Sequence, residues 1–92
     1  MSEVSIPTTL DGVLLELKAA YPAHKTTPGI QVAAIDDDAE GNPQFYAGIH
    51  IFPAGVASRK VVAKATASTA VQAMADAMQA WRYIIAQGHG NG

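Results

Sequence analysis

Four acidic residues lie close together in the first half of the chain: Asp36, Asp37, Asp38 and Glu40. Carboxylates at this density can pair with the arginines and lysines of a partner, or imitate the phosphates of a nucleic acid. A well-hydrated loop without any binding role also fits this run of residues. The sequence therefore predicts a candidate partner-binding loop, and the plainer alternative stays open.

A second group is basic and consists of Arg59, Lys60 and Lys64. These side chains could contact the backbone phosphates of RNA, each through a modest and salt-dependent interaction. Lysines on the outer strand of a sheet also prevent its edge from pairing with another chain. We expect a site for RNA or a protein partner here, with edge protection as the alternative.

A third group, Tyr46, His50 and Phe52, occupies even positions of one segment, so the three side chains share one face if the segment is a strand. The next expected strand adds four residues to the same face: Lys60, Val62, Lys64 and Thr66. Aromatic rings and lysines are suited to stacking on bases and following a phosphate backbone. The same residue types are common on strand faces that meet only solvent, so both interpretations stay open.

The sequence contains no arrangement typical of a catalytic or metal site. It has no nucleophile elbow, phosphate-binding glycine loop or zinc-protease motif, and no cysteine. The histidines His24, His50 and His89 lack the spacing of metal ligands. The acidic run resembles the start of a calcium-binding EF-hand loop, but its twelfth position is Ala47 where a glutamate is required. We therefore expect no enzyme activity, no cofactor and no metal.

Charge is separated along the chain. The formal net charge is −2, with seven acidic residues and two lysines in residues 1–50, and four basic residues and one aspartate in residues 51–92. This balance argues against a simple polybasic nucleic-acid binder. The longest uncharged run, residues 41–58, is interrupted by prolines and polar residues, so we expect no membrane span and no membrane partner.

Two segments show the periodicity of amphipathic helices. The first covers about residues 8–20, with Thr8 and Asp11 as a capping box and Pro22 ending the helix. The second begins after Thr69 or the serine before it. The apolar stripes expected on these helices are Leu10, Val13, Leu14, Leu17 and Tyr21 in the first, and Val71, Met74, Met78, Trp81 and Ile85 in the second.

Between the two helices the apolar period changes to two, which indicates strands. Strands are expected at about residues 30–34, 45–52 and 59–66, with a polar connection over 23–29 and an acidic turn over 36–43. The side chains expected to face the core are Ile30, Val32, Phe45, Ile49, Ile51 and Val61. The short connections make neighbouring strands antiparallel.

The sequence therefore predicts an α+β fold in which two helices pack on one face of a three-stranded antiparallel sheet, in the order α-β-β-β-α. A single domain is expected over residues 1–92, with its core over about 8–87 and a flexible glycine-rich tail over 88–92. The opposite face of the sheet is then left to solvent or to a partner.

The order of these elements, together with the GNPQFYAGIHI segment of the second strand, resembles a double-stranded RNA-binding domain. That family contacts RNA through its first helix, the loop between its first two strands and lysines at the start of its last helix. Here the loop, residues 36–43, is acidic, and residues 68–72 contain no lysine. The resemblance thus implies an arrangement of elements, and makes a small RNA-binding module the alternative function.

Taken as a whole, the chain resembles the small phage-encoded anti-CRISPR proteins that act on type I-F systems. The resemblance is carried by the IDDDAEGNPQF segment, the IFPAGVASRKVVAKAT segment and the two terminal helices. It implies a non-enzymatic inhibitor that binds the crRNA-guided surveillance complex in the bacterial host cytoplasm. Such an inhibitor contacts Cas subunits, with guide RNA as a candidate additional contact, and blocks target DNA binding. The sequence leaves the oligomeric state open.

Overall fold

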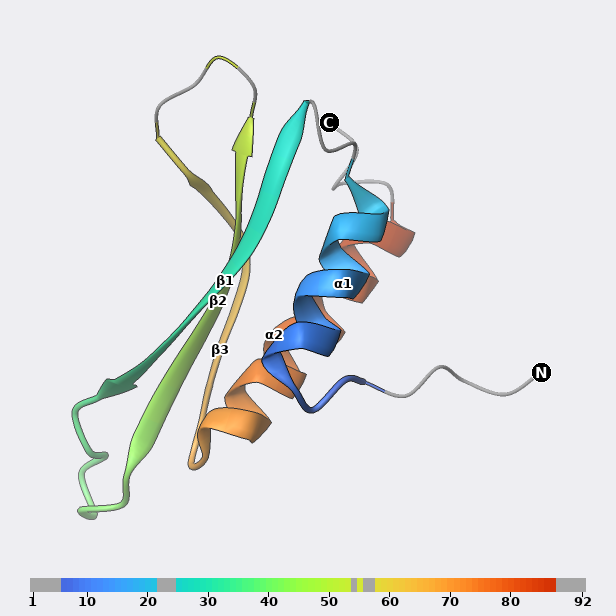
Figure 1. Cartoon of the computed structure of the whole chain (residues 1–92). Helices are drawn as coiled ribbons and strands as arrows, with labels where there is room; N and C mark the ends of the chain where they lie inside the picture. The colour runs from blue at the N-terminus through green and yellow to red at the C-terminus, as the bar shows by residue number, and fades with distance from the viewer. Residues whose placement is uncertain (1–5, 22–24, 54, 56–57, 88–92) are drawn as a thin grey trace.

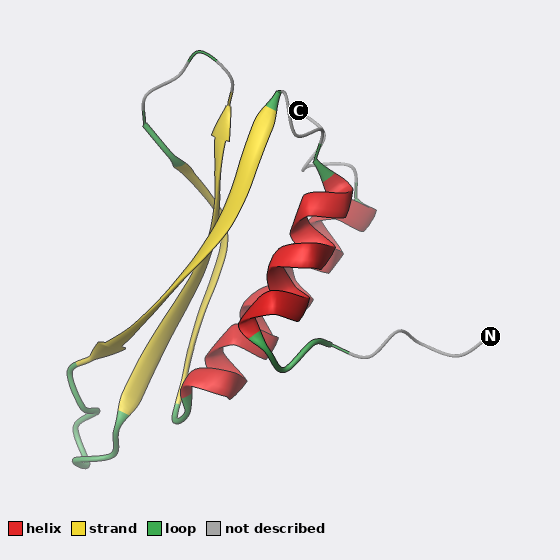
Figure 2. Ribbon diagram, in the orientation of Figure 1, coloured by secondary structure: helices red, strands yellow, loops and turns green. Residues whose placement is uncertain are grey.

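The computed structural model describes residues 6–21, 25–53, 55 and 58–87. In chain order they form α1 (Leu10–Ala20), β1 (Thr26–Ile35), β2 (Gln44–Pro53), β3 (Lys60–Ala67) and α2 (Ala70–Ala86). The strands make one antiparallel sheet in the order β1-β2-β3, and both helices lie on the same side of it (Figures 1 and 2). The expected α+β architecture is confirmed. The predicted helix stop at Pro22, the histidines His24 and His89 and the predicted tail, residues 88–92, lie outside the described residues.

Threonine side chains begin both helices. The hydroxyl of Thr9 accepts a hydrogen bond from the backbone N–H of Gly12 at 3.1 Å, and the hydroxyl of Thr69 accepts one from Gln72 at 3.1 Å. Each bond satisfies a donor that the first helical turn leaves without a partner. The prediction for Thr69 is confirmed. The capping box placed at Thr8 is wrong by one residue, because Thr9 is the residue whose hydroxyl reaches into the first turn.

The strand β1 begins at Thr26, four residues before the predicted start at Ile30. The segment that was expected to be a connection includes Pro28 and Gly29, which usually interrupt strands. Because β1 is an edge strand, it tolerates a proline, which has no backbone N–H to donate to a neighbour. Gly29 is present for a different reason, because the His50 side chain of β2 lies over it and leaves no room for a Cβ atom.

A β-bulge interrupts the pairing of β2 with β3. Ile49 pairs with Ala63, whereas the next residue of β2, His50, pairs with Val61. The extra residue is Val62, and it reverses the alternation of faces in the first part of β3. Val62 packs against the core, while Val61 is 46% exposed. The prediction that placed Val61 in the core and Val62 on the opposite face is wrong, because a strict period of two does not anticipate an extra residue.

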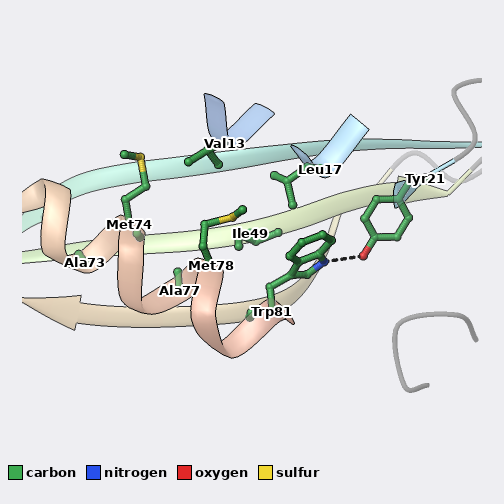
Figure 3. Packing of buried hydrophobic residues seen from close by; sticks show 11 residues of the cluster. Val13, Leu17, Tyr21, Ile49, Ala73, Met74, Ala77, Met78 and Trp81 are labelled. Atoms are coloured by element: carbon green, nitrogen blue, oxygen red, sulfur yellow. Dashed lines mark hydrogen bonds between the residues drawn. The ribbon is translucent and has the colours of Figure 1, made fainter. Parts of the chain in front are cut away.

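The hydrophobic core lies between the helices and the sheet, and several of its central side chains are small. Ala47 of β2 and Ala73 and Ala77 of α2 are fully buried. Methyl side chains allow the backbone of a helix to lie close to a sheet, so α2 packs against β3 and β2. Larger buried side chains surround these alanines, and Figure 3 labels them: Val13, Leu17, Tyr21, Ile49, Met74, Met78 and Trp81.

Several apolar side chains expected in the core are exposed instead. Val71 is 51% exposed at the start of α2, where the buried face is carried by Ala73 and Met74. In α1 the buried residues are Val13 and Leu17, whereas Leu10 and Leu14 are exposed, as is Val32 of β1. The apolar stripe of α1 is therefore wider than the surface that the sheet and α2 cover.

Two side-chain interactions join α1 and its end to α2. The indole N–H of Trp81 donates a buried hydrogen bond to the hydroxyl of Tyr21 at 2.9 Å, and their rings lie 6.3 Å apart (Figure 3). Arg82 donates two hydrogen bonds to the Glu16 carboxylate, at 2.7 and 2.5 Å. This hydrogen bonding raises the pKa of Arg82 above its ordinary value. Because the ion pair is partly exposed, its contribution is about 0.5–1 kcal/mol.

The buried hydrogen bond gives the first prediction. Tyr21→Phe keeps the ring but removes the acceptor, which leaves the indole N–H of Trp81 unpaired in the core. We expect the free energy of unfolding, measured by urea titration, to fall by about 1–3 kcal/mol. Tyr83→Phe is the matched control, because Tyr83 is 67% exposed on α2 and should change stability by less than about 0.5 kcal/mol. Equal stabilities of the two variants would contradict this role for Tyr21.

Candidate functional site

The face of the sheet that points away from both helices carries the aromatic group predicted from the sequence. In β2, Ala47 and Ile49 are fully buried on the helix side, so the alternate residues Tyr46, His50 and Phe52 point to the other side. We call this surface the open face. Its residues, from the sheet register, are Thr27, Gly29, Gln31 and Ala33 of β1, Tyr46, Gly48, His50 and Phe52 of β2, and Val61, Lys64 and Thr66 of β3.

Tyr46 lies back along its own strand over Gly48. A Cβ atom built on Gly48 would collide with the Tyr46 hydroxyl and lie 2.8 Å from the ring carbon that carries it. Gly48 is buried for this reason, although it belongs to the open face. The absence of a side chain at Gly48 thus gives the tyrosine ring a fixed place on the surface.

His50 lies across the sheet over Gly29, its register partner in β1. A Cβ atom on Gly29 would lie 2.6 Å from the Nε2 atom of His50, which explains why a glycine stands inside this strand. The imidazole also meets the Phe52 ring edge-on, with centroids 5.5 Å apart and an interplanar angle of 86°. Such edge-to-face pairs are attractive, so the two rings hold each other in place.

The imidazole of His50 is biased toward its neutral form. Partial burial lowers the pKa of His50 below its ordinary value of 6.5, and the charge of Arg59 lowers it further. At pH 7 the open face therefore presents His50 as an uncharged aromatic side chain. Arg59 precedes β3, so its charge acts at this end of the open face.

The three predicted basic residues do not share one face. Lys64 pairs with Gly48 and lines a shallow hollow of about 320 Å³ with Tyr46, Ala65 and Thr66. Lys60 pairs with Ile51, which packs against the core, so the bulge moves Lys60 to the helix side of the sheet edge. The prediction that placed Lys60 on the open face is wrong, because the β-bulge at Val62 reverses the alternation of faces in the first part of β3.

The acidic group and the basic group lie at opposite ends of the sheet. Residues 36–43 connect β1 to β2 next to the pair formed by Ile35 and Gln44, whereas Lys60 pairs with Ile51 toward the other end of β2. Gln44 and Ile51 are seven positions apart along β2, which corresponds to roughly 23 Å. Figure 1 shows the two connections at the two ends of the sheet. The acidic loop and Arg59 therefore cannot contact one small ligand together.

Asp38 has a structural role within the acidic loop. Its carboxylate accepts hydrogen bonds from the backbone N–H groups of Glu40 and Asn42, both at 2.9 Å, and from the Asn42 side chain at 3.3 Å. The bond from the Asn42 backbone is the main reason that the pKa of Asp38 lies below its ordinary value. Gly41 completes the turn with a φ of 83°. The candidate partner-binding carboxylates are then Asp36, Asp37 and Glu40, which are exposed.

The sequence interpretation assigned no role to Gly29 or Gly48, over which two rings of the open face lie. A glycine inside a strand often marks a close approach by another group, so both positions carried a signal. That signal does not say which side chain approaches. Tyr46 contacts a glycine two residues along its own strand, and His50 contacts one in a neighbouring strand.

Comparison of the chain with protein-family models, curated proteins and solved structures finds no match. Among the residues that the structure describes, no group of three or more His, Asp and Glu side chains could hold a metal ion. In the same part of the chain, neither helix has the length and apolar character needed to cross a membrane. The site must therefore be interpreted from its own geometry.

The seating of Tyr46 on Gly48 can be tested by a double-mutant cycle. Gly48→Ala should lower the free energy of unfolding by about 1–3 kcal/mol, because the new methyl group displaces the tyrosine ring. In a Tyr46→Ala background the same change should be neutral or stabilising by about 0.5 kcal/mol, since alanine is then the better strand residue. Urea titration of the four proteins measures the coupling. Equal effects of Gly48→Ala in both backgrounds would contradict the contact.

The effect of the Arg59 charge on the pKa of His50 can be tested by titration. Arg59→Ala should raise the pKa of His50 part of the way toward 6.5, whereas Lys64→Ala should leave it unchanged. The folded pKa lies below the unfolded one, so the stability that neutral His50 provides is complete above pH 6.5 and is lost as the pH falls through the folded pKa. NMR titration of the imidazole protons measures both variants. An unchanged pKa in Arg59→Ala would refute the proximity.

Proposed function

We propose that this protein is a non-catalytic binding protein that docks its open face onto a macromolecular partner. The observation that carries the proposal is the row of Tyr46, His50 and Phe52 beside Lys64, on a sheet face that neither helix covers. Rings placed on glycines keep their positions before binding, so little side-chain entropy is lost on docking. Aromatic residues with few charges are typical of the centre of a protein interface.

The charges near the open face favour a protein partner over RNA. Lys64 and Arg59 are the members of the predicted basic cluster that act on this face, since Lys60 lies on the helix side and His50 is held neutral. Two phosphate contacts with single-stranded RNA would give a slope of only about −1.4 for the logarithm of the binding constant against the logarithm of the salt concentration. This slope is small for an RNA-binding site. The hollow beside Tyr46 and Lys64 nevertheless suits one stacked base, which keeps RNA binding as the alternative.

Recognition of double-stranded RNA has less support. Two of the three surfaces that such a domain would use are residues 36–43 and the start of α2. Asp36, Asp37 and Glu40 are exposed in the first, and the first two turns of the second contain Gln72 and Asp76, whose side chains hydrogen-bond each other at 2.8 Å. Carboxylates at both places would repel phosphates.

For the partner we propose the crRNA-guided surveillance complex of type I-F CRISPR systems in a bacterial host, on the basis of the sequence resemblance. The open face would occupy the path of target DNA on the complex. The exposed carboxylates of Asp36, Asp37 and Glu40 would meet arginines and lysines of a Cas subunit. Because the acidic loop and the open face lie along one sheet, one partner could engage both, and a partner longer than roughly 23 Å would reach from the acidic loop to the other end of the open face.

The experiment is a gel-shift titration of target-DNA capture by an assembled type I-F complex. The protein should abolish capture at a stoichiometric excess. Tyr46→Ala should weaken inhibition at least tenfold, because it removes an aromatic anchor, and Lys64→Glu by about three- to tenfold, with a larger effect at low salt. Tyr83→Ala is the matched control, since it removes an exposed tyrosine from α2 and should inhibit like the wild type.

Normal DNA capture in the presence of excess protein would refute the proposed target. A fluorescence titration with naked single- and double-stranded RNA then separates the alternative. Submicromolar, salt-sensitive binding that Tyr46→Ala abolishes would support an RNA-binding module in place of a protein-docking inhibitor.

A further inference from the structure

One stripe of α1 faces neither the core nor α2. Asp11, Leu14, Leu15 and Lys18 follow one another at helical spacing and line one shallow surface hollow together. Leu15 is 67% exposed and Leu14 is exposed as well. We call these four residues the α1 stripe. It lies on the side of α1 away from Glu16, the residue that pairs with Arg82 of α2.

The α1 stripe borders the β1 edge of the sheet. Leu14 and Lys18 also line a groove of about 200 Å³ against the start of β1, which contributes Thr26, Thr27 and Pro28. β1 is an edge strand that contains no charged residue, whereas β3, at the other edge, contains Lys60 and Lys64. Charged residues on an edge strand oppose its association with another sheet. The β1 edge therefore lacks the protection that Lys60 and Lys64 give the β3 edge.

We propose that the α1 stripe binds a second copy of this chain through a twofold axis. The stripe is complementary to itself, because Asp11 and Lys18 lie at equal distances on either side of the midpoint between Leu14 and Leu15. Each charge lies about 5 Å along the helix axis from that midpoint. In an antiparallel pair of α1 helices, Asp11 of each copy therefore faces Lys18 of the other, and Leu14 faces Leu15.

The same residues argue against an unrelated charged partner. A strongly basic or acidic surface would meet one favourable and one unfavourable charge across the stripe, whereas an antiparallel copy satisfies both. The contact buries one face of a short helix, so the dimer is weak and forms in the micromolar to millimolar range. The open face lies on the other side of the sheet and stays uncovered in this dimer.

The test is sedimentation velocity of the full chain over a concentration series up to about 1 mM. The wild type should show a monomer–dimer equilibrium. Asp11→Lys places two lysines opposite each other at both ends of the stripe, and Lys18→Asp places two aspartates there. Each single variant should raise the dimer dissociation constant at least tenfold. Circular dichroism verifies that α1 stays folded, since both charges also match the dipole of the helix.

Two complementary samples make the test specific for this geometry. The double variant D11K/K18D restores both opposite-charge pairs and should dimerise like the wild type. An equimolar mixture of the two single variants should form a heterodimer, because every Lys–Lys or Asp–Asp contact is replaced by a Lys–Asp contact. Leu15→Glu, at an exposed position that folding tolerates, should abolish the dimer without altering Asp11 or Lys18.

A wild-type protein that remains monomeric at 1 mM would overturn the proposal. So would single charge variants that dimerise like the wild type, or a mixture of them that remains monomeric. These outcomes are independent of the gel-shift result for the open face, because the α1 stripe and the open face share no residue.

Discussion

The close approach of α2 to β2 and β3 is the constraint on which the rest of the molecule depends. Ala47 on β2 and Ala73 and Ala77 on α2 are fully buried, and larger side chains at these positions would force the two layers apart. Alanine side chains bury little apolar area, and the larger side chains around them, among them Met78 and Trp81, bury more. A chain of this size has residues for one core only, so that core lies on one side of the sheet.

Because both helices pack on one side of the sheet, the side chains on the other side have no layer to pack against. With no layer above it, the open face keeps its own side chains in order through contacts within the sheet. Tyr46 lies on Gly48, and His50 lies on Gly29 and against Phe52. The β-bulge at Val62 acts on the same surface, since it removes Lys60 from the open face and leaves Lys64 beside Tyr46. The result is an aromatic surface of low charge, which is better suited to a protein than to a phosphate backbone.

The charged side chains divide into those that maintain the fold and those that face outward. Arg82 and Glu16 join the helices, and Asp38 closes the turn between β1 and β2. The exposed carboxylates of the acidic loop lie on a different surface from the Asp11 and Lys18 side chains of α1. The molecule thus presents an open face and a self-complementary stripe on opposite sides of its sheet, so the two surfaces can be occupied at the same time.

The sequence by itself determined the type and order of the five elements, since periods of 3.6 and 2 follow from local backbone geometry. It also placed Tyr46, His50 and Phe52 on one face and identified Thr69 as a helix cap, because both depend on residues a few positions apart. The tertiary structure alone decided that Val61 is exposed, that Lys60 leaves the open face and that Gly29 and Gly48 hold aromatic rings. These features depend on strand register and on contacts between segments distant along the chain. Alternation within one strand does not contain that information.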